Sequence, residues 1–136
     1  MDIKVIAKRI KQASKSLLTI STKEKQTILK EISSEIIKNQ ENIKLANKKD
    51  VEGARDKGLS EAMIDRLALN NKRIKSMADS INELCTLPDP VGEITEDYER
   101  PNGIRVQRRR IPLGVIGVVY ESRPNVTIEA ASLCFY

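Results

Sequence analysis

The stretch IPLGVIGVVYESRPNVTIEAASLCFY, residues 111–136, decides the fold class of this chain. Its first part, residues 113–120, consists of apolar residues and glycine, and four of those residues are β-branched. A short β-branched run without polar alternation is typical of a strand that is covered on both faces. The run therefore predicts one buried strand, and with it an α/β fold.

A polar turn, residues 121–125, follows this strand and leads into a helix. Pro124 disfavours helical conformation at Arg123, so we expect the helix to begin just afterwards, with Asn125 or Thr127 as its N-cap. In open α/β sheets, ligands bind beyond the carboxyl ends of the strands. The turn is therefore a candidate binding site.

The side chains of the turn allow two interpretations. Arg123 could hold a carboxylate or phosphate in a bidentate fork. Asn125 could donate a hydrogen bond to a developing oxyanion, or it could cap the helix. The residues alone leave a binding site and a solvent-exposed polar loop equally open.

The first half of the chain has helical patterns. Apolar residues recur at spacings of three and four within residues 1–20, which predicts an amphipathic helix. Ser21 and Glu24 match a capping box that begins a second helix. The apolar side of that helix is expected to comprise Ile28, Leu29, Ile32, Ile36 and Ile43.

Further helices follow before the pattern changes. Gly58 suits the left-handed position that ends many helices, and Ser60 is a good N-cap for a helix over residues 61–69. Apolar spacing predicts another helix from about Lys72 to Leu84. The two prolines within residues 87–92 must end it.

A polar hairpin is expected next. The triplet Pro101, Asn102 and Gly103 is a turn signal, and the alternating residues 104–110 predict a half-exposed strand. The basic patch of this strand comprises Arg105, Arg108, Arg109 and Arg110. A nucleic-acid contact would fit its charge, but the chain has one Phe and no Trp to stack on bases. We expect the arginines to protect a strand edge or to pair with acidic neighbours, and we expect no nucleic-acid partner.

Composition narrows the class of protein. The 136 residues suffice for a single domain, which we divide into a helical region, residues 1–87, and a region of strands and a helix start, residues 88–136. The chain has no histidine, which excludes histidine-based catalysis from these residues. No signal peptide or membrane-spanning segment is recognisable.

Neither the cysteines nor the glycines of the apolar run indicate a site. Cys85 and Cys134 lack metal-ligand spacing, so we expect no metal, buried apolar roles for both thiols, and a cytoplasmic location. Gly114 and Gly117 lie inside the apolar run and not between a strand and a helix, so they do not match a dinucleotide loop. Close packing of a neighbouring backbone is the expected reason for them.

Several blocks of the sequence resemble one enzyme family. The run PLGVIGVVYESRPNVTIEAASLC, residues 112–134, is similar to the γ-glutamyl phosphate reductases, also called glutamate-5-semialdehyde dehydrogenases. Similar blocks occur at residues 46–70, 87–93 and 100–115, and YESRPNVT is the most specific motif. The resemblance implies an aldehyde-dehydrogenase-like architecture, of which this chain would hold an incomplete cofactor domain.

The resemblance also implies an activity. Members of the family reduce L-glutamyl 5-phosphate to the semialdehyde with NADPH in proline biosynthesis, through acyl transfer to a cysteine thiolate. It implies a small-molecule substrate, which Ser122, Arg123 and Asn125 would contact beside the active site. It leaves the NADPH-binding residues of this chain unknown.

The sequence departs from the family pattern after residue 134. The nucleophilic cysteine of the family lies beyond that point, and Cys134 matches a non-catalytic position. The resemblance therefore implies a truncated reductase without a catalytic residue or a catalytic domain, inactive alone.

A non-catalytic interaction module is the alternative hypothesis. Unpaired buried backbone groups cost about 1–3 kcal/mol each. Residues 113–120 should accordingly be solvated, paired with residues 104–110, or paired with another protein. The alternative module would bind a complementary chain, or a second copy of itself, through this open strand.

Overall fold

The computed structural model describes residues 2–136, which divide into two compact units. One unit comprises residues 1–20 and 88–117, of which Met1 lies outside the described part. The other comprises residues 21–87 and 118–136. Each unit is described by itself.

The first unit begins with the amphipathic helix that the sequence predicts. Helix α1 spans Ile3–Ser16, and a single 3-10 turn, η1, spans Leu17–Thr19. The Asp2 carboxylate caps α1 by accepting a hydrogen bond from the Lys4 amide at 2.8 Å. None of the residues of α1 is buried, so its apolar side is uncovered.

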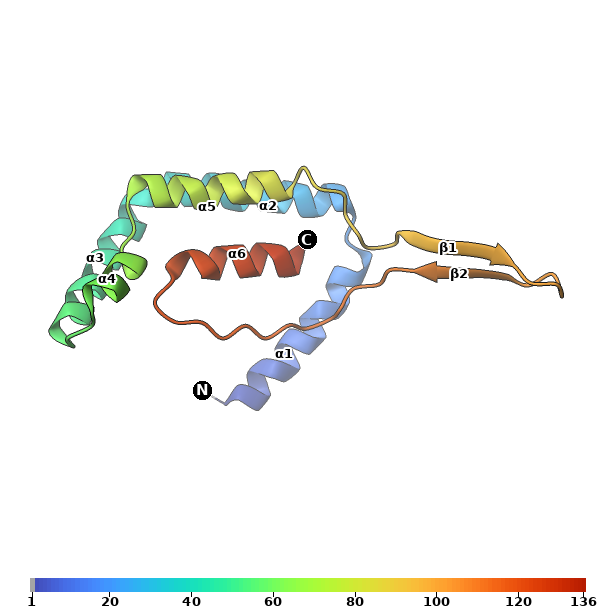
Figure 1. Ribbon diagram of the computed structural model, residues 1–136, viewed down its shortest axis with the longest axis horizontal. Helices are drawn as coiled ribbons and strands as arrows, with labels where there is room; N and C mark the ends of the chain where they lie inside the picture. Colours follow the sequence, from blue (N-terminus) through green and yellow to red (C-terminus); the bar gives the residue numbers. More distant parts are fainter. Residues whose placement is uncertain (1) are drawn as a thin grey trace. The chain divides into compact units, whose positions relative to one another are not determined.

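The same unit contains the predicted hairpin. Strand β1 (Ile94–Glu99) pairs antiparallel with β2 (Arg105–Arg109), and Tyr98 lies opposite Val106 in the register. The two strands form a ribbon with a tight turn (Figure 1). Gly103 has a φ of +81° in that turn, a conformation that glycine adopts without steric cost. The turn chemistry that the sequence indicated is therefore confirmed.

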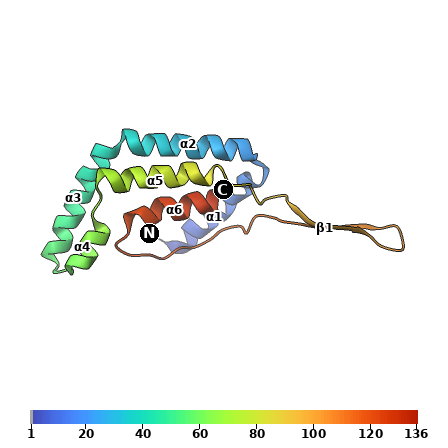
Figure 2. The ribbon, with the colours of Figure 1, turned by 45° about the horizontal axis from the view of Figure 1, so that its top comes forward.

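The second unit is a stack of helices. Helix α2 spans Thr22–Lys38, α5 spans Asn71–Leu84 and α6 spans Pro124–Phe135. Helix α5 packs against α2 on one side and α6 on the other (Figure 2). The largest fully buried side chains of this unit are Leu29 of α2 and Ile74 and Ile81 of α5. Burial of each contributes about 1.5–3 kcal/mol to stability.

The buried stripe of α2 differs from the expected one. Its buried residues are Lys25, Leu29, Ser33 and Ile36. Ile28 and Ile32 are exposed, because they lie one position round the helix from the stripe that faces α5. The Ser33 hydroxyl donates to the Ala78 carbonyl at 3.0 Å, so a polar residue occupies the stripe with its hydrogen bond made.

Helix α2 also ends earlier than the apolar pattern predicts. The chain leaves the helical conformation at Asn39, and Ile43 belongs to the next helix, α3 (Gln40–Asp56). The Asn39 amide nitrogen donates to the Glu35 carbonyl at 2.8 Å. This side-chain bond closes the last turn and competes with continued helix formation.

A short helix, α4 (Glu61–Leu67), lies between α3 and α5. Gly58, with φ +71°, occupies the left-handed position after α3, as expected. Ser60 is the N-cap residue of α4 but makes no side-chain capping bond, whereas the Asn70 side chain caps α5 at 2.8 Å. The helices predicted in this region are confirmed, with α4 ending two residues early.

Residues 113–120 do not form the predicted buried strand. They have no regular secondary structure, and Leu113 and Val119 are 89% and 100% exposed. A strand needs a neighbour for its backbone groups, and within residues 2–136 β1 and β2 pair only with each other. Within the chain residues 113–120 are exposed, and they do not pair with residues 104–110. The α/β class is confirmed, but its sheet is the hairpin alone.

Among residues 2–136, none of the helices combines the length and the apolar character that crossing a bilayer requires.

Candidate functional site

The turn after residue 120 leads directly into α6. Ser122 has a φ of +51°, a left-handed conformation that is uncommon for a residue with a side chain. Arg123 is the N-cap residue, with a non-helical backbone of φ −139° and ψ 83°, and Pro124 begins the helix. The prediction that Asn125 or Thr127 caps α6 is wrong, because proline lacks the N–H that the first helical position leaves unpaired and so fits there.

The structure brings two of the three candidate residues to one hollow. Arg123 and Asn125 both line a depression of about 290 Å³ in the second unit, and Ser122 is not among its lining residues. The Asn125 side chain donates to the Glu129 carboxylate at 3.1 Å across one turn of α6. Its amide is therefore held in place at the start of the helix.

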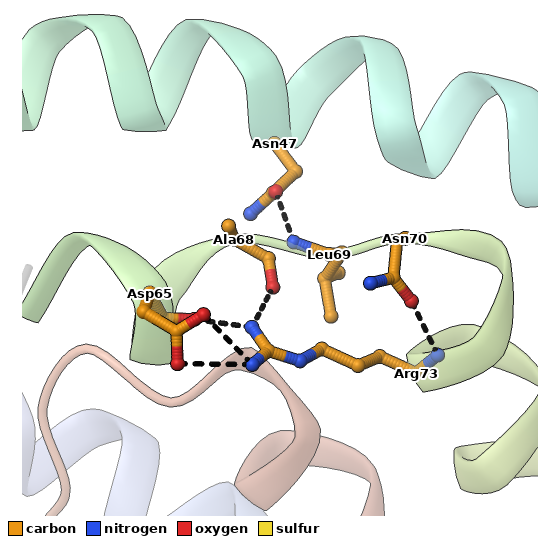
Figure 3. Close-up of polar contacts among 6 residues, drawn as sticks. All are labelled: Asn47, Asp65, Ala68, Leu69, Asn70 and Arg73. Carbon is orange, nitrogen blue, oxygen red and sulfur yellow. Dashed lines mark hydrogen bonds and ion pairs between the residues drawn. The ribbon is translucent and has the colours of Figure 1, made fainter. Parts of the chain in front are cut away.

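The opposite side of the hollow comes from α4 and α5. Asp65 and Arg66 of α4 line it together with Arg73, in the first turn of α5. The Arg73 Nη2 atom lies 3.0 and 3.1 Å from the two Asp65 carboxylate oxygens, and Nη1 donates to the Ala68 carbonyl at 2.7 Å and to that of Asp65 (Figure 3). These contacts fix the turn between the helices.

Sequence reasoning missed these three charged residues. Asp65 and Arg73 are eight positions apart with a helix break between them, so they do not fit the three- or four-residue spacing of helical ion pairs. Arg66 has no pattern that marks it. The one usable local signal is Asn70. It caps α5, so it determines where the helix begins and places Arg73 in the first turn.

A buried asparagine attaches the same turn to α3. Asn47 donates to the Leu67 carbonyl at 2.9 Å. It also accepts from the Leu69 amide at 2.7 Å (Figure 3). A single side chain thereby satisfies two backbone groups of the connection between α4 and α5. The turn between Asp65 and Arg73 is thus attached to α3 as well as α5.

The basic patch of the hairpin pairs with acidic neighbours, as predicted. Arg105 bonds to Asp97, Arg108 to Glu96 at 2.5 Å and Arg110 to Glu93 at 3.0 Å. Hydrogen bonds from Arg105, and then from Gln107, lower the pKa of Asp97 to about 2. Three of the four arginines of the patch are thereby engaged.

The two cysteines have different surroundings. Cys85 is buried, as expected, and burial raises the pKa of its thiol. Cys134 is exposed, so the prediction of a buried role is wrong for it. The buried face of α6 is the one that carries Ser132, and Cys134, two residues on, is turned about 200° away from it. Both thiols are free.

The described residues do not have the arrangement of a dinucleotide-binding fold. Gly114 and Gly117 lie in the exposed irregular segment, and an added Cβ would meet no atom within 4 Å at either position. The expectation of close backbone packing there is therefore wrong, and Gly114 instead has a φ of +89°. A dinucleotide fold needs a parallel sheet and a glycine turn that opens a helix, whereas the sheet of residues 2–136 is an antiparallel pair. Over the same residues, no cluster of three or more His, Cys, Asp or Glu residues could hold a metal ion.

Comparison with known proteins accounts for this arrangement. No protein-family model matches the sequence. The chain is 50% identical over 133 residues to γ-glutamyl phosphate reductase of Geobacillus sp. strain WCH70, and 51% identical over 124 residues to that of Escherichia coli O1:K1. These matches cover 98% and 91% of the chain. The chain is a homologue of the γ-glutamyl phosphate reductases.

Solved reductase structures have the same fold over the matched region. The reductase of Thermotoga maritima superposes with a TM-score of 0.92 at 42% identity, and that of Saccharomyces cerevisiae with 0.90 at 32% identity. They cover 95% and 96% of this chain, which matches their N-terminal part.

The match extends over only part of the reductases. The chain spans 32% of the Geobacillus reductase and 31% of the Thermotoga structure, so about a third of the length of the relatives it matches. The similarity of residues 112–134 to the reductases, which the motifs of this region indicated, is confirmed by these relatives.

Proposed function

We propose that this chain provides the N-terminal part of a γ-glutamyl phosphate reductase. The substrate would be L-glutamyl 5-phosphate and the reductant NADPH, in proline biosynthesis. The observation that supports this most is the agreement of sequence and fold over nearly the whole chain, with 50% identity to one reductase and a TM-score of 0.92 to another. The aligned region covers 98% of the residues and therefore spans the turn at residues 121–125.

The proposal assigns substrate contacts to Ser122, Arg123 and Asn125. Arg123 and Asn125 line one hollow, and the guanidinium and amide are donors suited to an acyl phosphate and to a developing oxyanion. Ser122, with its left-handed backbone, sets the direction in which the chain enters α6. Strained residues of this kind concentrate at functional turns.

NADPH would be held outside the described residues. Residues 2–136 offer no parallel sheet edge or glycine turn for it, so no reaction step is assigned to this chain through the cofactor. The contribution of the chain is to hold and orient the substrate. Free thiols at Cys85 and Cys134 are compatible with the reducing cytoplasm, where we propose that the protein acts.

We further propose that residues 2–136 form a single, incomplete domain and do not turn over the substrate alone. Residues 113–120 present unpaired backbone groups and exposed apolar side chains, and the remainder of a reductase would supply the missing strands. Pairing with those strands also explains why residues 113–120 are exposed here, which is the observation on which the interaction-module hypothesis rests. That hypothesis therefore gains no observation of its own.

A chimaera tests the proposal. The matching third of the Geobacillus reductase is replaced by this chain, and NADPH oxidation is followed with freshly prepared glutamyl phosphate. We expect turnover by the chimaera and none by the 136-residue chain. Arg123→Ala and Asn125→Ala in the chimaera should each lower kcat/KM, while Arg109→Ala on the hairpin should not. A folded chimaera without activity, or turnover by the chain alone, contradicts the proposal.

A further inference from the structure

The hollow beside α6 has an uneven distribution of charge. Five charged residues line it: Asp65, Arg66, Arg73, Arg123 and Glu129. They come from α4, from the first turn of α5 and from the start of α6, so residues about fifty positions apart converge on it. Three cations and two anions leave a net charge of +1 (3 − 2).

The anions of the hollow are already engaged. Both carboxylate oxygens of Asp65 accept bonds from Arg73, whose other terminal nitrogen is bonded to backbone carbonyls. Glu129 accepts from Asn125. Arg73 is therefore occupied within the protein and has little capacity left for a ligand.

Two guanidinium groups remain. Neither Arg66 nor Arg123 has a side-chain hydrogen bond or ion pair to any residue of the described range 2–136. Helix α6 adds positive potential, because it begins at Pro124 without a side-chain cap. A planar guanidinium with open donors matches the geometry of a carboxylate or a phosphate.

We propose that this hollow is an anion subsite in which Arg66 and Arg123 together bind a carboxylate or phosphate group. Arg73 is a positioning residue: bonded to Asp65, it holds the end of α4, on which Arg66 lies. The assignment deepens the proposed function, on which it rests for the identity of the anion, because L-glutamyl 5-phosphate has both a carboxylate and a phosphate end. Arg66 is the residue that this inference adds to the substrate contacts, since the turn at residues 121–125 supplies only one arginine, Arg123.

An NMR titration of the 136-residue chain tests the subsite. Isotope-labelled chain is titrated with inorganic phosphate and, separately, with acetate, at constant ionic strength set by sodium chloride. We expect saturable shifts of the Arg66 and Arg123 Nε–H signals, and the tighter of the two anions identifies which end of the substrate fits. Arg66→Gln should weaken binding about tenfold or more, because a charge-assisted bond is lost. Arg109→Gln on the hairpin is the matched control.

The positioning role has its own readout. Asp65→Asn should leave the Arg66 charge intact yet weaken anion binding, and hydrogen exchange at the Leu69 amide should accelerate. Asp79→Asn, which removes a carboxylate from an exposed pair with Lys75 on α5, is the control. If Asp65→Asn leaves the anion affinity unchanged, Arg73 does not position the subsite.

Three outcomes overturn the subsite itself. They are the absence of saturable shifts with either anion, equal weakening by Arg66→Gln and Arg109→Gln, and a chain whose spectrum lacks dispersed α4 and α5 signals, because such a chain has no hollow. These results are separable from the chimaera experiment. Turnover by the chimaera without anion binding here would retain the proposed function and reject the subsite.

Discussion

Asp97 shows how strongly one side chain on the hairpin is constrained. Its carboxylate accepts bonds from the Arg105 Nε and Nη2 atoms at 2.8 and 2.6 Å and from Gln107 at 2.9 Å. Three donors to the charged form favour ionisation, which is why the pKa of Asp97 falls from 3.8 to about 2. The stability that Asp97 contributes is therefore present above pH 3.8 and is lost as the pH falls through about 2.

Replacement of Arg105 should return Asp97 towards its ordinary behaviour. In Arg105→Gln we expect the pKa of Asp97 to rise from about 2 towards 3.8, measured by the carboxyl carbon shift between pH 1.5 and roughly 6. Arg109→Gln, on the same strand, serves as the control and should leave the titration unchanged. An equal rise in both variants would mean that the net charge of the strand, and not the direct bonds, sets the pKa.

The N-cap of α2 is a second case at the residue scale. The Ser21 hydroxyl accepts from the Glu24 amide at 3.3 Å, and the Glu24 carboxylate accepts from the Ser21 amide at 2.8 Å. The bonds to Ser21 lower the pKa of Glu24. We expect Ser21→Ala to reduce the free energy of unfolding by about 1 kcal/mol, the usual contribution of such a cap.

Urea unfolding followed by circular dichroism measures this loss. Ser34→Ala is the control, because Ser34 lies within α2 and only bonds back to the Lys30 carbonyl of its own helix. Equal losses in the two variants would show that the effect is general to serine in α2 and not due to capping.

At the scale of elements, α3 is attached to the connection between α4 and α5 by one side chain. Asn47 is buried and bonds to both Leu67 and Leu69. The other buried side chains of this corner are Ala54 of α3 and Ile64 of α4. A polar residue thus contributes to the attachment together with apolar ones.

Removal of this side chain should loosen the corner. We expect Asn47→Ala to destabilise the chain by about 1–3 kcal/mol, because two partly buried backbone groups lose their partner. The exchange rate of the Leu69 amide should rise at the same time. Asn42→Ala, on the exposed side of the same helix, is the matched control. Slow Leu69 exchange in Asn47→Ala would contradict this account.

At the scale of the whole molecule, the uncovered apolar surface stands out. Residues 113–120 and the apolar side of α1 are exposed together with Leu45 and Leu133. Exposed apolar patches on a protein mark interaction sites or association. The hydrophobic core, by contrast, is confined to the second unit and centres on α2 and α5.

A charge placed on this surface should reduce association without loss of stability. Val119 is fully exposed, so Val119→Lys removes no packing, and we expect a change in unfolding free energy within about 0.5 kcal/mol. Sedimentation should show less self-association than for the parent chain. Ile81→Lys, at a position 1% exposed in the core, should abolish the fold. Unchanged association in Val119→Lys would show that this segment is not the contact.

Local interactions determined most of what could be predicted. The capping box at Ser21, the glycine after α3 and the hairpin turn follow from the preferences of a few adjacent residues. The arginines of the hairpin were correctly expected to pair with acidic neighbours, because cross-strand partners follow once the turn is known. The candidate turn at residues 121–125 was recognised in the same way, from its own side chains and its motif.

The sequence by itself determined the helices, their caps and the hairpin, because each depends on contacts within a few residues. Only the tertiary structure decided which side of α2 is buried, since Leu29 faces α5 and Ile28 does not. It also brought Asp65 and Arg73 together across a helix break and joined Arg66 and Arg123 at one hollow. Residues 113–120 have the composition of a strand but do not form one in this structure. A strand exists only where another backbone supplies its hydrogen bonds.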